Sequence, residues 1–151
     1  MKKALFYLVL LSLMSACKKT PSVDCNSPTN DLALCKEYII GKWEWVKNIR
    51  YYGGYKVSTP QTAGITRTLN FRTDGIVETY INGQFKDTSS YEIYDGIQIS
   101  KPDSGTTFLT FREYNYIVPR SVILKVCDDS LYLPYEGLIY HNGNDYYSRV
   151  K

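Results

Sequence analysis

Apolar and polar side chains alternate along most of the chain after residue 41. Between residues 42 and 51, tryptophan, isoleucine and tyrosine alternate with charged or amide side chains, apart from one break at Val46-Lys47. This period of two is typical of β-strands that have one face on a core and the other in water. Similar short segments follow at 65–71, 76–81, 91–93, 97–99, 108–111, 122–126, 131–133 and 146–150.

Turn-forming residues separate these segments, and Asn82-Gly83 is the strongest hairpin signal among them. No clear helical pattern follows the first strand. Eight or nine short strands joined by hairpin-length connections favour an up-and-down barrel over a Greek-key sandwich, which needs long crossovers. We therefore predict an all-β fold, an up-and-down antiparallel barrel of about eight strands. The other predicted turns and loops are Gly53-Gly54, Thr73-Asp74-Gly75, Asp95-Gly96, 101–105 and Asp128-Asp129-Ser130.

A short helix is predicted before the first strand. Thr29 or Asn30 can cap it, and Gly41 ends it or marks the break. Leu32, Cys35 and Ile39 lie on one face of this helix, because they are spaced three or four residues apart. That apolar face needs a surface to cover, so we expect the helix to cover one end of the barrel.

The first sixteen residues have the order of a secretory signal peptide. Met1-Lys2-Lys3 is basic, residues 4–14 are apolar apart from Ser12, and Ser15-Ala16 are small. Eleven residues are too few to span the roughly 30 Å of membrane hydrocarbon as a mature helix. We predict a signal peptide over 1–16, a polar and flexible tether over 17–29, and one domain over 30–151.

Cys17, directly after Ser15-Ala16, resembles the lipobox cysteine of bacterial lipoproteins, with Met14 where that pattern expects leucine. The resemblance implies that Cys17 carries lipid and becomes the mature N-terminus. The alternative is an ordinary secreted protein in which Cys17 joins a disulfide. Lys18-Lys19-Thr20 lacks the acidic residues of surface-export signals, and no Asp follows Cys17 directly. We therefore expect an outer-membrane anchor, on the periplasmic face rather than the cell surface.

Three cysteines remain for disulfide formation once Cys17 is lipidated. The compartment outside the inner membrane permits disulfides. Cys25 and Cys35 close a short loop and form our preferred pair, while Cys35 with Cys127 is the alternative. An odd count leaves one thiol over, which we expect to be buried.

Charge and composition argue against several functions. Removal of Lys2 and Lys3 with the signal peptide leaves 16 basic and 15 acidic residues, which argues against a nucleic-acid partner. The one histidine, His141, lies in a Gly/Asn loop that is a poor mount for a general base. No metal-ligand spacing is present, and Asp128-Asp129 suits a turn better than a calcium loop. We expect no enzyme activity, catalytic residue, metal or cofactor.

Two short motifs resemble the lipocalins. Gly41-Lys42-Trp43 resembles their Gly-x-Trp signature, and 146–150 resembles the last strand of bacterial lipocalin-like lipoproteins, which often carries an arginine. The resemblance implies that Arg149 packs on Trp43 at the closed end of the barrel, as a cation–π contact of about 0.5–2 kcal/mol.

Arg67 is the candidate anchor for a ligand. It is in phase with Ile65, Leu69 and Phe71, the predicted inward set, and an inward arginine can bind a carboxylate or phosphate. The alternatives are a pair with Glu78 or a place at the rim. By the same alternation of inward and outward side chains, we expect Trp45, Tyr51 and Phe71 to form part of a cavity wall.

Two functions other than catalysis follow from such a barrel. The first is a lipid-anchored monomer that binds a small hydrophobic or amphiphilic molecule, which small eight-stranded barrels can hold. The second is a protein-interaction or inhibitor module that acts through its loops and has a filled core. A filled interior would favour the second.

Overall fold

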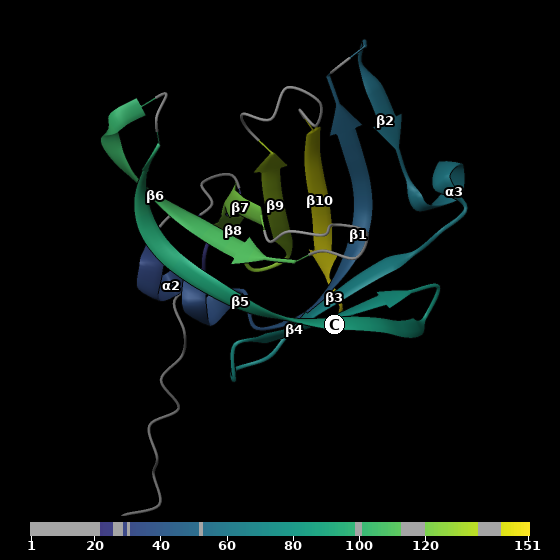
Figure 1. Cartoon of the computed structure of the whole chain (residues 1–151), viewed down its shortest axis with the longest axis horizontal. Helices are drawn as coiled ribbons and strands as arrows, with labels where there is room; N and C mark the ends of the chain where they lie inside the picture. The colour runs from purple at the N-terminus through teal and green to yellow at the C-terminus, as the bar shows by residue number, and fades with distance from the viewer. Residues whose placement is uncertain are drawn as a thin grey trace, which may run out of the picture.

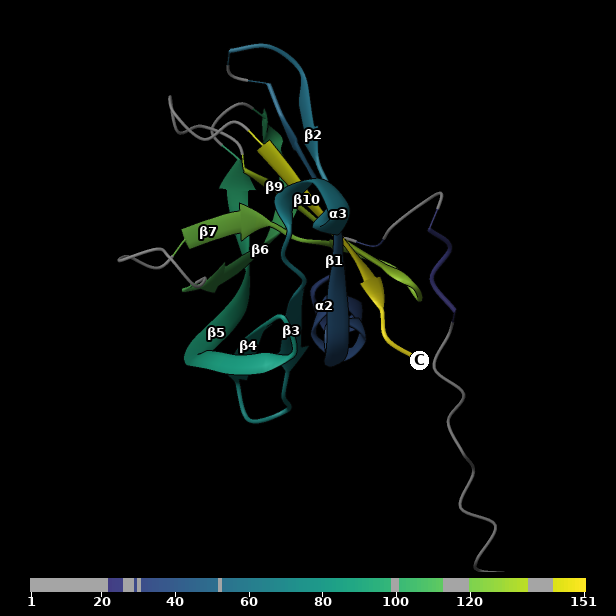
Figure 2. The same ribbon diagram turned by 90° about the vertical axis from the view of Figure 1, so that its right-hand side faces the viewer.

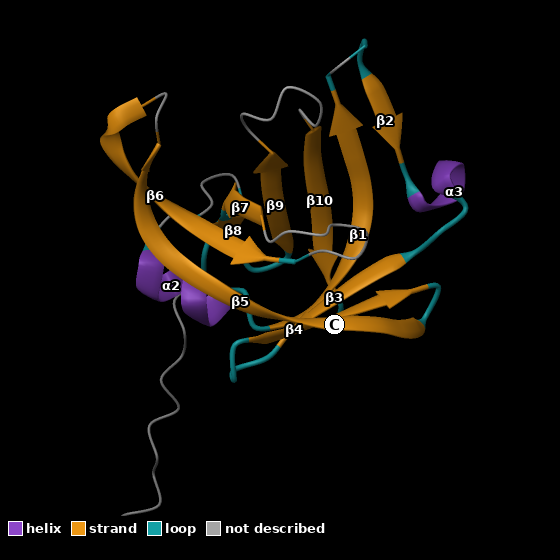
Figure 3. Cartoon of the chain, viewed as in Figure 1, coloured by secondary structure: helices purple, strands orange, loops and turns teal. Residues whose placement is uncertain are grey.

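The computed structural model describes residues 22–25, 29, 31–51, 53–98, 101–112, 120–135 and 143–151. The predicted signal peptide, Cys17 and His141 lie outside the described residues. No described helix is long and apolar enough to cross a membrane. The helices are α2 (Leu32–Tyr38) and α3 (Pro60–Ala63), and the strands are β1 (Gly41–Arg50), β2 (Lys56–Ser58), β3 (Arg67–Phe71), β4 (Ile76–Ile81), β5 (Gln84–Gln98), β6 (Lys101–Phe111), β7 (Arg120–Ile123), β8 (Lys125–Val126), β9 (Ser130–Tyr135) and β10 (Gly143–Arg149) (Figures 1 and 3).

The strands form a nearly closed antiparallel barrel in which neighbours along the chain lie side by side. The pairing order is β7-β6-β5-β4-β3-β1-β10-β9-β8. β7 and β8 are separated only by Leu124, yet β7 pairs with β6 and β8 pairs with β9. This one segment therefore links the two edges of the sheet. β2 is outside this order and pairs with β1. With β2 left out and β7 and β8 counted together, the described chain has eight strands around the core, and the predicted up-and-down barrel is confirmed.

The core fills the interior at the end of the barrel where β1 begins. The buried side chains come from every wall, and two edge-to-face contacts join Phe71 to Tyr91 and Phe111, with ring centroids 5.1 and 5.9 Å apart. Burial of each large apolar side chain contributes about 1.5–3 kcal/mol. The largest side chains with less than 2 % exposure include Trp43, Leu69, Phe71, Leu109, Phe111, Leu124, Leu131 and Leu133.

Two predicted turns are wrong, and both fall in the long β5–β6 hairpin. Asp95-Gly96 lies within β5, and residues 101–105 lie within β6. A Cβ on Gly96 would lie 2.8 Å from the Phe108 ring, which stacks on Tyr94. Gly96 is therefore explained by the close approach of an aromatic ring within the sheet rather than by a turn.

The helix α2 packs at the end of the barrel where β1 begins, which we call the closed end (Figure 2). Its N-cap is Asp31, whose carboxylate accepts from the Leu34 N–H at 2.9 Å. The predicted caps, Thr29 or Asn30, were wrong by one or two residues, because the Thr29 hydroxyl accepts from Asp31 N–H instead. Cys35, within α2, and Ile39, at its C-cap, are fully buried, as the predicted apolar face of the helix requires.

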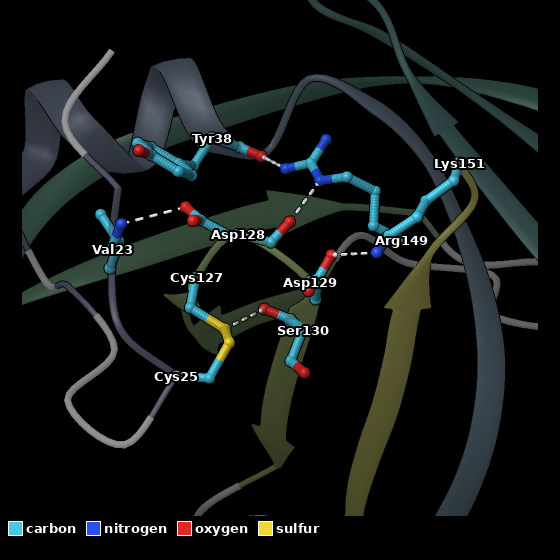
Figure 4. Close-up of a disulfide and its surroundings, with 9 residues drawn as sticks. All are labelled: Val23, Cys25, Tyr38, Cys127, Asp128, Asp129, Ser130, Arg149 and Lys151. Atoms are coloured by element: carbon cyan, nitrogen blue, oxygen red, sulfur yellow. Dashed lines mark hydrogen bonds and ion pairs between the residues drawn. A yellow bond between two sulfur atoms is a disulfide. The ribbon is translucent and has the colours of Figure 1, made fainter. Parts of the chain in front are cut away.

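Arg149 links the C-terminal end of α2 to the barrel through hydrogen bonds. Its guanidinium lies 4.2 Å from the Trp43 ring centroid, so the predicted pairing of these two residues is confirmed. The same group donates hydrogen bonds to the carbonyl oxygens of Tyr38, Ile40 and Asp128. Figure 4 shows the bonds to Tyr38 and Asp128. Gly41 has φ +118°, and a Cβ there would lie 3.2 Å from Arg149 Nη1. A glycine two residues before Trp43 therefore gives the arginine room to reach these carbonyls.

The disulfide joins Cys25 to Cys127, so the preferred Cys25–Cys35 pair and the alternative Cys35–Cys127 pair are both wrong. Short loop length was a poor guide, because the chain folds back to place residues 102 positions apart side by side. Among the described cysteines, Cys35 is the free one and is buried, as expected for the cysteine left over. Burial raises the pKa of this thiol to about 11.

The predicted tether is fastened to the barrel over part of its length. Val23 is buried, its N–H donates to the Asp128 carboxylate at 3.0 Å, and its carbonyl accepts from the Asp128 N–H. Thr29 forms a β-bridge with Val126. The described residues between 22 and 29 are therefore held at the closed end, in contrast to the flexible tether predicted over 17–29.

Candidate functional site

Five side chains from three strands meet on the inner face of the barrel, and we call them the inner polar cluster: Trp45 and Asn48 from β1, Arg67 from β3, and Asp145 and Tyr147 from β10. β1 can supply both Trp45 and Asn48 because it has a bulge. The register shifts between Trp45 and Lys47, so that Trp45 opposes Tyr147 and Asn48 opposes Asp145. Because the bulge adds one residue to the strand, Trp45 and Asn48 can both face inward although they are three positions apart.

Asp145 is the centre of the cluster and is only 4 % exposed. Its Oδ1 accepts hydrogen bonds from Trp45 Nε1 at 3.1 Å and from Asn48 Nδ2 at 2.9 Å. Its Oδ2 lies 3.3 Å from the Arg67 guanidinium. A buried carboxylate is tolerated only when charge and hydrogen bonds replace water, and these three partners supply both.

Arg67 faces inward, as its parity predicted. Its guanidinium lies 5.3 Å from the Trp45 ring centroid and 5.5 Å from that of Tyr147. At these distances the electron-rich faces of the two rings attract a cation. The Arg67 side chain is 17 % exposed to solvent, whereas the Asp145 side chain is 5 % exposed. The cation is therefore the more accessible member of the ion pair.

The alternative pairing of Arg67 with Glu78 is wrong. Glu78 opposes Asn70, which alternates with the buried Leu69 and Phe71 and so points to the outer face. There the Glu78 carboxylate accepts from Asn70 at 2.8 Å, from the Tyr80 hydroxyl at 2.9 Å and from Arg72 at 3.2 Å. These three donors lower the pKa of Glu78 below its ordinary value.

The inner polar cluster lies between the apolar core and the end of the barrel where β1 finishes and β10 begins, which we call the far end. Asp145 is two residues from the start of β10, and Asn48 is two residues from the end of β1. Asn48 Oδ1 accepts from Arg50 Nε at 3.1 Å, which extends the polar chain outward. A second cation therefore stands next to the cluster on its exposed side.

The other predicted wall residues have different places. Trp45 belongs to the cluster, but Phe71 is 1 % exposed and packs in the core four residues along β3 from Arg67. Tyr51 is 52 % exposed and lies on the surface, so its predicted place in the cavity wall is wrong. The bulge in β1 exchanges the inward and outward positions of all later residues in the strand, so Tyr51 faces outward. Ile65, expected inside before Arg67, is also exposed, at 40 %.

Tyr51 is nevertheless held in place from the barrel. Its hydroxyl accepts from Asn144 Nδ2 at 3.2 Å, and its ring lies 6.1 Å from that of Tyr55. Both tyrosines belong to the β1–β2 hairpin, which projects at the far end (Figures 1 and 2). The hairpin therefore presents aromatic surface to solvent.

A pocket of about 670 Å³ lies away from the inner polar cluster, against α2. None of Trp45, Tyr51, Arg67 and Phe71 lines it. Its charged lining groups are two carboxylates and one ammonium, which is a poor match for an anion. The lining residues are Lys36, Glu37, Ile40, Thr73, Gly75, Tyr91, Glu92 and Ile93.

No metal centre is found among the described residues, since no group of three or more His, Cys, Asp or Glu side chains there could hold an ion. Comparisons with protein-family models, curated proteins and solved structures give no match to this chain. The function of this chain is therefore inferred from the geometry of the site.

Sequence reasoning missed Asp145 and Asn48. Asp145 could have been found, because it shares the parity of Tyr147 and Arg149 on the last strand and is therefore inward. Asn48 could not be found by alternation alone, because the bulge that turns it inward is visible in the sequence only as a break in the pattern.

Proposed function

We propose that this protein is a lipid-anchored binding protein of the bacterial envelope, which holds a small anionic amphiphile at the inner polar cluster. The observation that carries the proposal is the setting of Arg67. This cation lies on the inner face between two aromatic rings and keeps 17 % of its side-chain exposure. The barrel and the Arg149–Trp43 contact also support the lipocalin-like resemblance.

The cluster is suited to an anionic headgroup. Arg67 and Arg50 contribute two positive charges against the single negative charge of Asp145. Guanidinium groups bind carboxylates and phosphates through two parallel hydrogen bonds. Trp45 and Asn48 both donate to Asp145 and so hold the cluster in place. The ligand would therefore meet a preorganised Arg67 guanidinium. The apolar tail would extend from Arg67 towards the far end, because Trp45 and Tyr147 are only 5 % and 2 % exposed. Binding of this kind requires no cofactor and no catalytic group.

Removal of the Arg67 charge is expected to weaken the binding of an anionic amphiphile. Titration calorimetry with dodecyl phosphate should show at least a tenfold weaker Kd for Arg67→Gln/Asp145→Asn, in which both charges of the buried pair are neutralised together. The matched control is Arg72→Gln, on the outer face next to β3. It loses contacts only with Asp74 and Glu78 and should bind as the wild type does. Equal affinity in all three proteins would contradict the proposal.

Cys17→Ser is expected to release the protein into the soluble fraction and to abolish labelling by radioactive palmitate. One acyl chain gives only marginal membrane binding, while two or more hold the protein stably. Fractionation of cells that express the wild type and the variant checks this prediction. Palmitate that still enters the Cys17→Ser protein would contradict the lipid assignment.

A second candidate function is a protein-interaction module, and exposed apolar surface favours it. Five of the seven large hydrophobic side chains that are exposed in the described chain fall between residues 46 and 65: Val46, Tyr51, Tyr55, Val57 and Ile65. No acidic residue occurs from Trp45 to Thr73. Tyrosine with arginine is common at the centres of protein interfaces, so this surface suits an acidic partner.

A further inference from the structure

The N-terminal segment is attached to the closed end of the barrel by three independent links. Val23 N–H donates to the Asp128 carboxylate, the Val23 carbonyl accepts from the Asp128 N–H, and Cys25 is bonded to Cys127. Thr29 N–H donates to the carbonyl of Val126. All three partners on the barrel lie in β8 or in the turn that follows it. One of them, Asp128, also accepts a hydrogen bond from Arg149 (Figure 4).

Only five residues separate Cys17 from this attachment. They are residues 18–22, between the proposed lipid-bearing cysteine and Val23. A fully extended chain spans about 3.3–3.6 Å per residue, so the closed end cannot lie more than about 20 Å from the anchor point. The segment 18–22 is too short to let the barrel reverse its orientation and bring the far end to the membrane.

The inner polar cluster faces the opposite way. β10 runs from Gly143 at the far end to Arg149 at the closed end, a distance of about 20 Å at roughly 3.3 Å per residue. Asp145 lies in the half of β10 nearer the far end, and the β1–β2 hairpin extends beyond it (Figure 1).

We infer that the barrel stands with its closed end on the anchoring membrane and its far end turned to the aqueous compartment. The inference rests on the proposed lipidation of Cys17. It implies that the ligand site takes an amphiphile delivered through water, from a carrier protein or from the facing membrane. Lateral entry from the anchoring bilayer is excluded, because the filled core and α2 lie between that bilayer and the cluster.

Energy transfer to the membrane surface tests this orientation. The lipidated mature protein is bound to phosphatidylcholine vesicles that carry a headgroup-labelled acceptor lipid. A donor dye is attached through p-azidophenylalanine, placed either at Lys151, beside Asp129 at the closed end, or at Tyr55 in the far hairpin. Both positions are exposed, and neither belongs to the inner polar cluster. Transfer should be clearly stronger from position 151 than from position 55.

An insertion provides the matched control. Twenty Gly/Ser residues between Lys19 and Thr20 should bring the two transfer efficiencies close together, because a long flexible linker releases the constraint. Equal transfer from both positions without the insertion, or stronger transfer from position 55, would overturn the orientation while the lipid anchor stands. Failure of the wild type to bind vesicles would overturn the anchor and the orientation together.

Discussion

Trp43→Ala is expected to lower the free energy of unfolding by about 3–5 kcal/mol. The Trp43 side chain is fully buried at the closed end, and its Nε1 donates to the Ile39 carbonyl at 2.7 Å. Loss of the ring opens a large cavity, removes that hydrogen bond and leaves the Arg149 guanidinium without its stacking surface. Urea denaturation followed by circular dichroism measures the change.

Two control variants separate the causes. Trp43→Phe keeps an aromatic ring but loses the N–H donor, and should cost less than Trp43→Ala. Val46→Ala, on the same strand but 43 % exposed, should change the unfolding free energy by no more than about 0.5 kcal/mol. A Trp43→Ala protein as stable as Val46→Ala would show that the closed end does not depend on this ring.

Reduction of the disulfide is expected to cost about 2–5 kcal/mol of stability. The bond joins Cys25 to Cys127 across 102 residues, so it restricts the unfolded chain strongly. Denaturation of the wild type with and without dithiothreitol measures the effect.

A double variant serves as the control for that experiment. Cys25→Ala/Cys127→Ala should unfold like the reduced wild type and should not respond to dithiothreitol. Cys35 cannot replace either partner easily, because burial raises its thiol pKa to about 11 and leaves almost no thiolate for exchange at neutral pH. An unchanged unfolding midpoint on reduction would contradict a stabilising role for the bond.

The sequence was sufficient to predict the architecture because local signals agree with it. Alternation located most strands, and Asn82-Gly83 marks the β4–β5 turn. The inward direction of Arg67 followed from the parity of β3, which has no bulge. The Arg149–Trp43 contact followed from the resemblance to lipocalins.

The errors arise where distant parts of the chain decide the outcome. Disulfide connectivity depends on which segments meet in space, and spacing along the chain carries little information about that. Tyr51 was placed on the wrong face because one bulge reverses every later side chain of the strand. Asp95-Gly96 wrongly predicts a turn, because the sequence does not show that Phe108 approaches Gly96 across the sheet.

The most direct test of ligand binding at the inner polar cluster uses the two tryptophans of the chain. Trp45 donates its indole N–H to Asp145 in the cluster, whereas Trp43 donates to Ile39 at the closed end. A nitrogen-15 correlation spectrum of the mature chain, with Ser at Cys17, resolves the two indole signals. Titration with dodecyl phosphate should shift the Trp45 signal and leave that of Trp43 in place. A Trp45 signal that does not move at saturating dodecyl phosphate, or a shift of Trp43 alone, would contradict the account.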